Sequence, residues 1–261
     1  YLGPLRLLAL EVYDRMMADG IPCDMITGEE IILTKNSFVQ ASTVEILDIR
    51  ETYDIAVIDE AQMVADENRG SFWTRAILGI RAKEVHVCCS GTARDLLVKM
   101  LKRCGDEIEI VSHERNTRLV FVPERYDMSK DVEPGDALIA FSKKNVLAIA
   151  AALESRGIRA SVIYGNLPPQ TRQEQVRLFT EGVSKVVVAT DAIGMGINLP
   201  IRRVVFMNTT KFDGVGKRRL LAEEIRQIAG RAGRYGFYDT GYVQSALDME
   251  YVGKKLSEPF Y

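Results

Sequence analysis

Short apolar runs rich in β-branched residues alternate along the chain with amphipathic stretches. The runs fall at residues 54–58, 86–90, 108–112, 137–141, 161–164, 185–189 and 203–207, and their lengths are typical of strands. Residues 5–19 and 145–156 have a helical pattern and are followed by Gly20 and Gly157, a residue type that commonly ends helices. This alternation predicts βαβ units, and therefore an α/β fold with mostly parallel sheets covered by helices.

The alternation lapses between about residues 116 and 134, where Pro123, a charged segment and the pair Pro134 and Gly135 interrupt it. A chain of 261 residues is long enough for one large domain or two ordinary ones, because chain length divided by about 150 residues is a guide to the number of domains. We therefore expect a linker here, between a first domain at residues 1–120 and a second at residues 121–261.

Composition narrows the class of protein without naming a ligand. Hydrophobic residues make up 47% of the chain and charged residues 27%, which is typical of a folded globular protein. The net charge of −2 lacks the basic excess that marks many nucleic-acid-binding domains, and it neither supports nor excludes RNA. No apolar run reaches the roughly 18 residues of a membrane span. Cys88 and Cys89 lie in an apolar run with no C-x-x-C pair, and we expect them to be buried core thiols.

The first chemical motif is Asp-Glu-Ala-Gln at residues 59–62, directly after the predicted strand at residues 54–58. Open α/β sheets bind ligands at the carboxyl ends of their strands. Asp59 there could hold Mg²⁺ on a nucleotide while Glu60 activates water. A strand that ends in a solvated acidic turn is the alternative for this motif taken alone.

The second motif is Gln-x-x-Gly-Arg-x-Gly-Arg at residues 227–234, at the end of a helical pattern that begins near Ala222. We expect Arg231 and Arg234, three positions apart, to lie on one helix face, where they could stabilise the charge on a transferring phosphate. The alternative is a basic helix end that complements its own dipole.

The third motif, at residues 189–198, is a buried strand that leads into a glycine-punctuated turn, which could bind phosphate through backbone amides and the Thr190 hydroxyl. In this order and spacing the three motifs resemble motifs II, VI and V of the superfamily 2 helicases. Residues 162–170, 188–203 and 227–234 further resemble the mitochondrial degradosome RNA helicase family and its bacterial relatives.

The resemblance covers the whole chain and implies two tandem RecA-like domains. Residues 3–9, 27–29, 43–45, 90–93 and 141–143 resemble motifs Ia, Ib, Ic, III and IV. The phosphate-binding loop G-x-x-x-x-G-K-[ST] is not found, because the Gly-Lys pairs at 216–217 and 253–254 lack that context. We therefore expect a partial chain whose first domain lacks its N-terminal strand and P-loop, with negligible ATP hydrolysis until that segment is restored.

The family's roles can be carried over onto matching positions. The resemblance implies an ATP-dependent RNA helicase that uses ATP and Mg²⁺, with Asp59 holding the metal and Glu60 directing the attacking water. Gln227, Arg231 and Arg234 would act on the γ-phosphate, and Gly196 and Asn198 would lie at the nucleotide. The implied nucleic-acid contacts are Arg6, Thr27, Gly28, Thr43, Ser142, Lys143 and Thr190.

The resemblance also implies RNA as the partner, single-stranded or duplex with an overhang, an exoribonuclease as a second partner, and no membrane. The location would be the bacterial cytoplasm or, in a eukaryote, the mitochondrion. Two alternatives stay open: a DNA helicase or translocase, and a non-hydrolysing fragment that binds RNA or protein. Lys211 to Arg219 is interpreted as an exposed basic turn, with an RNA-contacting loop as the alternative, and Trp73 is expected to pack in a core.

Overall fold

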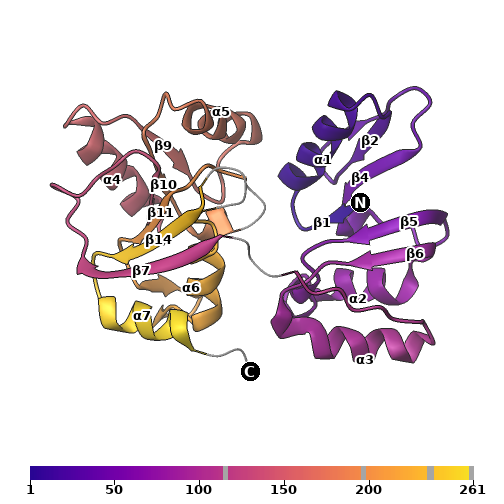
Figure 1. Ribbon diagram of the computed structural model, residues 1–261. Coiled ribbons are helices and arrows are strands. Elements are labelled where there is room, and N and C mark those ends of the chain that lie inside the picture. The colour runs from indigo at the N-terminus through magenta and orange to yellow at the C-terminus, as the bar shows by residue number, and fades with distance from the viewer. Residues whose placement is uncertain (114–116, 195–197, 234–237, 259–261) are drawn as a thin grey trace. The chain divides into compact units, whose positions relative to one another are not determined.

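The computed structural model describes residues 1–113, 117–194, 198–233 and 238–258. The chain divides into two compact units, Tyr1–Ser112 and His113–Pro259, and each is described by itself (Figure 1). Both units are mostly parallel sheets covered by helices, which confirms the predicted fold class. The predicted domain boundary between residues 120 and 121 falls inside a strand of the second unit, Arg118–Arg125.

The first unit is built on a sheet in the order β3-β2-β4-β1-β5-β6, in which only β3 is antiparallel to its neighbour. The strands are β1 (Leu2–Gly3), β2 (Cys23–Ile26), β3 (Ile31–Ile32), β4 (Val39–Thr43), β5 (Thr52–Ile58) and β6 (Arg81–Val87). The helices are α1 (Arg6–Ala18), α2 (Gly70–Gly79) and α3 (Arg94–Cys104), with short 3-10 turns η1 (Val44–Ile46), η2 (Ala61–Ala65) and η3 (Gly91–Ala93).

The first sheet buries its two faces against different helices. Ala9 of α1 packs with Cys23, Met25 and Ala41 of β2 and β4. Trp73 of α2 belongs to a separate cluster, whose other buried members are Leu2, Val44, Leu47, Ile58, Ala61, Ala76, Ile77, Ala93 and Leu97. Because successive side chains of a strand point to opposite faces, one sheet supports both cores (Figure 1). Trp73 is fully buried, which confirms its predicted packing role.

The second unit is built on a wholly parallel sheet in the order β7-β14-β11-β8-β10-β9. Its strands are β7 (Arg118–Arg125), β8 (Asp136–Ile139), β9 (Ala160–Ile163), β10 (Val186–Ala189), β11 (Arg203–Phe206) and β14 (Thr240–Ser245). Its helices are α4 (Lys143–Glu154), α5 (Pro169–Thr180), α6 (Ala222–Ala229) and α7 (Met249–Ser257), with the 3-10 turn η4 (Asp191–Gly194) and a separate hairpin of β12 (Thr210–Phe212) and β13 (Lys217–Arg219).

The centre of the second sheet explains its continuous apolar runs. Every residue of β8 and β10 is buried, as is typical of parallel strands covered on both faces. Figure 1 shows α4 and α5 on one side of this sheet and α6 and α7 on the other. Gly157 follows α4 with a positive φ of 74°, the left-handed conformation that favours glycine at a helix end.

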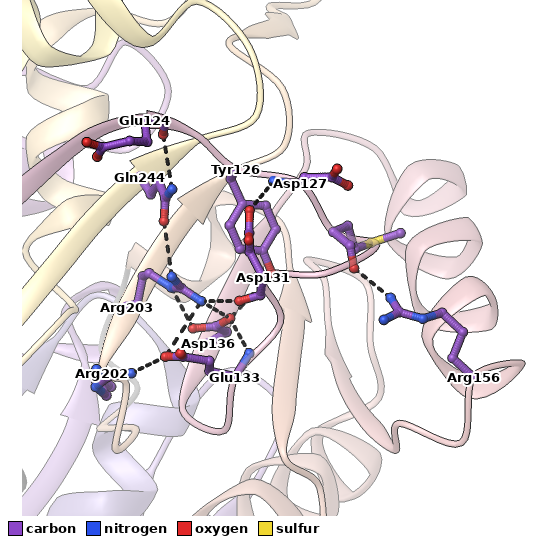
Figure 2. A network of polar contacts seen from close by, with 11 residues as sticks. Glu124, Tyr126, Asp127, Asp131, Glu133, Asp136, Arg156, Arg202, Arg203 and Gln244 are labelled. Atoms are coloured by element: carbon purple, nitrogen blue, oxygen red, sulfur yellow. Dashed lines mark hydrogen bonds and ion pairs between the residues drawn. The ribbon is translucent and has the colours of Figure 1, made fainter.

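A buried polar network lies where β8 and β11 begin, at the N-terminal edge of the second sheet (Figure 2). The side chain of Asp136 is 0% exposed, and it pairs with Arg203 through two bonds of 2.8 and 2.7 Å. The Arg203 guanidinium also donates to Gln244 Oε1 at 3.1 Å and lies over the Tyr126 ring. Burial raises the pKa of the Tyr126 hydroxyl, and the Asp136 charge raises it further while Arg203 opposes the change. We call these four residues the Asp136 network.

The structure corrects three predictions. Residues 108–112 form no strand, and Ile110 and Val111 are exposed, because that segment pairs with no described strand. The expected linker contains β7, which pairs with β14, so tertiary pairing overrides the turn-forming residues around it. Cys88 and Cys89 are exposed rather than buried, since they follow β6 at the edge of the first sheet.

None of the helices in the described ranges has both the length and the apolar character that a membrane-spanning helix needs.

Candidate functional site

Asp59 and Glu60 lie at the carboxyl end of β5, as the sequence predicted. Asp59 Oδ1 accepts a hydrogen bond from the Glu60 amide at 2.8 Å, and Oδ2 accepts one from the Tyr1 hydroxyl at 2.8 Å. Burial, followed by the charge of Asp59, raises the pKa of the Tyr1 hydroxyl, so it stays a donor at neutral pH. The backbone of Glu60 is left-handed, with φ of 49°, a strained conformation for this residue type that often marks a functional position.

Gln62 joins two of the predicted motifs within the first unit. Its Nε2 donates to Glu60, and its Oε1 accepts from the Ser90 amide at 3.2 Å. Ser90 in turn shares a 2.7 Å hydrogen bond with Thr92. The glutamine of the Asp-Glu-Ala-Gln motif therefore has hydrogen-bond partners in two motifs of its own unit.

The predicted nucleic-acid contacts of the first unit share one edge of the sheet. Arg6 follows β1, Thr27 and Gly28 follow β2, and Thr43 ends β4. Because β1, β2 and β4 are mutually parallel, their carboxyl ends lie at the same edge, which is also where β5 ends.

These contacts differ in how free they are to bind a ligand. Arg6 forms ion pairs with Glu30 and, at 3.9 Å, with Glu29. Thr27 is 4% exposed, and its hydroxyl donates to the Glu30 carbonyl at 3.1 Å. A Cβ added at Gly28 would meet no atom within 4 Å. Gly28 therefore offers an open backbone, while Arg6 would have to exchange a carboxylate for a phosphate.

A cavity of about 450 Å³ opens at the carboxyl edge of the second sheet. It brings together three predicted contacts that are far apart in the sequence: Ser142, Lys143 and Thr190. The other lining residues are Phe141, Tyr164, Gly165, Asn166, Asp191, Ala192, Lys211, Glu224, Gln227 and Ile228. The cavity exists because β8, β9 and β10 are parallel and neighbouring, so that the segments after them meet at one place.

The cavity has features that favour an anion. Ser142 caps α4 by accepting from the Asn145 amide at 3.1 Å, and the Lys143 ammonium lies 5.0 Å from the centre of the Tyr164 ring. No carboxylate within the described ranges forms an ion pair with Lys143. A helix N-terminus and a lysine without a carboxylate partner both attract phosphate. The Thr190 hydroxyl accepts from the Ala192 amide at 3.3 Å.

Gln227 and Arg231 both contact the turn that follows β10. Gln227 Nε2 donates to the Gly194 carbonyl at 3.4 Å, and Arg231 donates to the same oxygen. Helix α6 ends at Ala229, so Arg231 lies in the turn beyond it. The expected single helix face for the two arginines is therefore wrong, because the helix is shorter than its pattern. Arg234 and Gly196 lie outside the described residues, and Asn198 is exposed.

Gly233 has a packing role that the sequence did not suggest. A Cβ there would lie 2.4 Å from the backbone nitrogen of Gly241, and φ is 63°. Its amide donates to the Ile201 carbonyl at 2.7 Å. Gly233 therefore allows the start of β14 to pack closely against it.

The hairpin of β12 and β13 is attached to the cavity by ion pairs. Lys211 Nζ lies 3.0 Å from Asp191 and 2.7 Å from Glu224, and Arg218 binds Glu224 through bonds of 2.8 and 2.9 Å. Burial alone would raise the pKa of Glu224, but hydrogen bonds from Arg218, Lys211 and the Leu221 amide lower it to about 2. The segment expected as a basic turn is thus a hairpin in which Lys211 and Arg218 form ion pairs with carboxylates.

Sequence reasoning missed Tyr164, Asn166 and Glu224 as cavity residues. Tyr164 and Asn166 follow the strand at 160–163 and could have been found from the rule that carboxyl ends of parallel strands bind ligands. No sequence pattern indicated that Glu224 lies at the cavity, because the β12–β13 hairpin brings its partner Lys211 beside it.

The candidate Mg²⁺ site has one protein ligand, the Asp59 carboxylate. No cluster of three or more His, Cys, Asp or Glu side chains is found among the described residues. Mg²⁺ on a nucleotide commonly takes only one or two protein carboxylates, with phosphates and waters as its other ligands. A single Asp59 carboxylate at the end of β5 fits that donor set.

Comparison with known families identifies the class. Residues 95–236, more than half of the chain, match the helicase conserved C-terminal domain. The chain therefore belongs to the superfamily 2 helicases. Within that class, residues 1–113 match the DEXQ-box helicase domain of Suv3, which agrees with Gln62 in the motif and confirms the predicted family.

Curated relatives lead to the same family. The chain is 41% identical over 268 residues to the mitochondrial ATP-dependent RNA helicase SUV3L of Oryza sativa subsp. japonica, covering 100% of this chain and 36% of that protein. It is 44% identical over 238 residues to DExH16 of Arabidopsis thaliana, a mitochondrial DExH-box ATP-dependent RNA helicase, covering 90% and 42%. It is 41% identical over 246 residues to human SUPV3L1, also a mitochondrial ATP-dependent RNA helicase, covering 90% of this chain and 31% of that protein. The chain thus spans between 31% and 42% of the curated relatives it matches.

Solved structures support the fold alone. Saccharomyces cerevisiae Dbp5 bound to RNA and ADP BeF3 has a TM-score of 0.69 at 18% identity, covering 99% of this chain and 75% of that one. The L327V variant of Dbp5 bound to Gle1 and IP6 has a TM-score of 0.70 at 19% identity, covering 98% and 73%.

Proposed function

We propose that this chain is the motor core of an ATP-dependent RNA helicase, which couples ATP hydrolysis to translocation on RNA and to unwinding. The observation that carries the proposal is the cavity of the second unit, where Ser142, Lys143 and Thr190 meet. Two further observations support it: the carboxylate pair at the end of β5, and the family match over both halves of the chain.

In the first unit, Asp59 would hold Mg²⁺ and Glu60 would orient and deprotonate the attacking water. The metal supplies charge neutralisation for the phosphates when it is bound. Glu60 is suited to its role because the left-handed backbone and the bond from Gln62 hold its carboxylate in place. Gln62 would report the state of this site to Ser90. The actions of Gln227, Arg231 and Arg234 on the nucleotide stay predictions.

In the second unit, the N-terminus of α4, Lys143 and Thr190 would bind the phosphate backbone of RNA. Hydroxyls, amides and one lysine bind phosphates without a basic surface, which accounts for RNA binding by a chain of net charge −2. In the first unit, Arg6, Thr27, Gly28 and Thr43 would extend the backbone contacts.

The location and the second partner are part of the proposal. Curated relatives from plants, fungi and animals are named mitochondrial, and we propose the same location if the source is a eukaryote, or the cytoplasm if it is a bacterium. An exoribonuclease that degrades the unwound strand stays a prediction.

ATPase measurements on the native protein test the proposal. Its ATPase should be stimulated by single-stranded RNA or by duplex RNA with an overhang, measured as phosphate release. Glu60→Gln should lower kcat by about 10²- to 10⁴-fold and change the KM for ATP little, because it removes a general base without removing Asp59. Glu67→Gln, at an exposed position in the loop after η2, is the matched control and should keep full activity.

Each alternative gives a different result. Equal stimulation by DNA of the same sequence would favour a DNA translocase. RNA binding with no ATP turnover would favour the non-hydrolysing fragment. Full RNA-stimulated activity in Glu60→Gln would contradict the role of this carboxylate.

A further inference from the structure

Glu224 is saturated with donors that come from two elements. Oε1 accepts from Arg218 at 2.9 Å and contacts Lys211 Nζ at 2.7 Å, while Oε2 accepts from Arg218 and from the Leu221 amide, each at 2.8 Å. A carboxylate offers about four acceptor positions, so these contacts use all of them. We call Glu224, Lys211 and Arg218 the Glu224 junction. Its side chains are only 21–32% exposed, which strengthens ion pairs relative to the surface.

The hairpin held by this junction is short and locally rigid. Its strands pair from Thr210 with Arg219 to Phe212 with Lys217, and at the tip Asp213 accepts from the amides of Val215 and Gly216 at 3.0 and 2.9 Å. Val215 is 96% exposed and Phe212 63% exposed. The hairpin therefore exposes apolar side chains at and near its tip, while Lys211 and Arg218 attach it to Asp191 and Glu224.

Lys211 also connects the hairpin to the turn after β10. Besides Glu224 it contacts Asp191, the residue after Thr190 and the first residue of η4. The last residue of η4, Gly194, accepts hydrogen bonds from Gln227 and Arg231. Gln227 lies three positions after Glu224 on α6 and therefore on the same helix face.

These contacts form a closed ring from the hairpin through η4 and α6. A displacement of the hairpin or of Thr190 changes the Lys211 contacts, and among the described residues the ion-pair partner of Lys211 on α6 is Glu224. Rotation or translation of α6 then moves Gln227 relative to Gly194. Packed helices and ion pairs transmit such changes because they have few intermediate arrangements.

We propose that Glu224 is a positioning residue that couples occupancy of the cavity and the hairpin to the placement of Gln227, so that bound RNA accelerates ATP turnover through this carboxylate. The inference rests on the proposed function. It adds a specific route between the RNA-binding cavity and the Gln227 segment, which the sequence assigned to ATP hydrolysis.

The test uses the native protein, an unstructured oligoribonucleotide as the probe, and the ratio of RNA-stimulated to basal kcat. Glu224→Gln keeps the size of the side chain and an acceptor for the Leu221 amide but removes the charge. It should lower the ratio by about tenfold, within the usual range of coupling between two sites. The RNA concentration for half-maximal stimulation should change by less than about threefold, because the phosphate contacts stay in place.

Two further variants separate coupling from damage. Lys211→Met should reproduce the loss, and the double variant should be no worse than either single one, because both act through one contact. Glu224→Asp should recover part of the ratio. Glu174→Gln, in an exposed ion pair with Arg177 on α5, is the control and should keep the wild-type ratio.

The possible results separate a failure of the Glu224 coupling from a failure of the proposed helicase function. A wild-type protein without RNA-stimulated ATPase overturns the proposed function. A stimulated wild-type protein overturns the inference alone if Glu224→Gln keeps its ratio, if its basal and stimulated rates fall equally, or if the effects of the Glu224 and Lys211 variants add.

Discussion

The second unit has two charged networks at opposite ends of the strands of one sheet, and the side chains of the two networks differ in burial. The Asp136 network lies where the strands begin, and its carboxylate is 0% exposed. The Glu224 junction lies beside the cavity where the strands end, and its carboxylate is 21% exposed. Both carboxylates bind an arginine through two bonds, and Glu224 also lines the cavity.

Because of this difference in burial, we expect the Asp136 network to contribute mainly to stability and the Glu224 junction mainly to function. A fully buried charge must keep its partner, because water cannot replace it. A charge at the rim of a cavity can exchange partners at a modest cost, since solvent compensates for part of the loss. A carboxylate–arginine pair therefore holds β8 to β11 where the strands begin, and another can respond to a ligand where the strands end.

The largest effect should come from breaking the buried pair. Asp136→Asn leaves Arg203 buried without its carboxylate and should lower the free energy of unfolding by about 3–5 kcal/mol. Glu133→Gln, which removes a carboxylate that is 51% exposed from the same region, should cost less than about 1 kcal/mol. Urea denaturation followed by far-UV circular dichroism measures the change.

The first unit provides an internal reference for that measurement. The chain has one tryptophan, and Trp73 is buried in the first unit, so its fluorescence reports unfolding there. Asp136→Asn should shift the dichroism transition and leave the fluorescence transition in place. An equal shift of both would contradict a local effect.

The next largest effect should come from Gly233→Ala, near the start of β14. The new Cβ would lie 2.4 Å from the Gly241 nitrogen at a φ of 63°, and the sum of clash and backbone strain should be about 2–4 kcal/mol. Gly157→Ala is the matched control, because φ there is 74° but no atom lies within 4 Å. It should cost only about 1 kcal/mol. Equal midpoints of thermal unfolding for Gly233→Ala and Gly157→Ala would show that backbone strain acts alone and that the clash with Gly241 adds nothing.

The Glu224 junction should contribute less to stability, with a defined pH dependence. Glu224→Gln should lower the free energy of unfolding by about 1 kcal/mol at pH 7. The pKa of Glu224 is lowered to about 2 in the folded protein, from an ordinary value of 4.5. The stabilisation is therefore complete above about pH 4.5 and is lost as pH falls toward 2. Denaturation midpoints of the two proteins should differ by a constant amount from pH 7 to 5 and converge below that. A difference that grows on acidification would contradict the assignment.

The smallest effect should be on RNA affinity. Lys143→Gln should weaken binding of a labelled oligoribonucleotide several-fold and reduce the slope of log K against log salt by about 0.7, the value for one phosphate contact on a single strand. Fluorescence anisotropy at several salt concentrations measures both. Lys144→Gln, at the next position and not among the cavity residues, should change neither. An unchanged slope in Lys143→Gln would remove this lysine from the interface.

Much of the fold followed from local patterns. The apolar runs at 137–141, 185–189 and 203–207 became β8, β10 and β11, because continuous burial needs no information beyond the run itself. The run at 108–112 failed, since an apolar segment becomes a strand only where a partner is present. β7 was missed for the converse reason, because its pairing with β14 lies more than a hundred residues away in the chain.

The candidate site was predictable to different degrees. Asp59 and Glu60 were placed correctly at the end of β5, because motif and strand are adjacent in sequence. Ser142 and Thr190 could each be named, but their meeting in one cavity required the order of the parallel strands. The prediction that Arg231 lies on the helix was wrong, since α6 ends at Ala229.

The sequence by itself determined the α/β class, the helicase motifs and the chemical type of each candidate residue, because these depend on neighbours within a few positions. Only the tertiary structure decided that Gly233 packs against Gly241, that Gln62 bonds to Ser90, and that Lys211 joins Asp191 to Glu224. Such contacts connect residues brought together by sheet order and loop paths. A side chain's partners are therefore set by the whole fold, whereas its chemistry is set by its residue type.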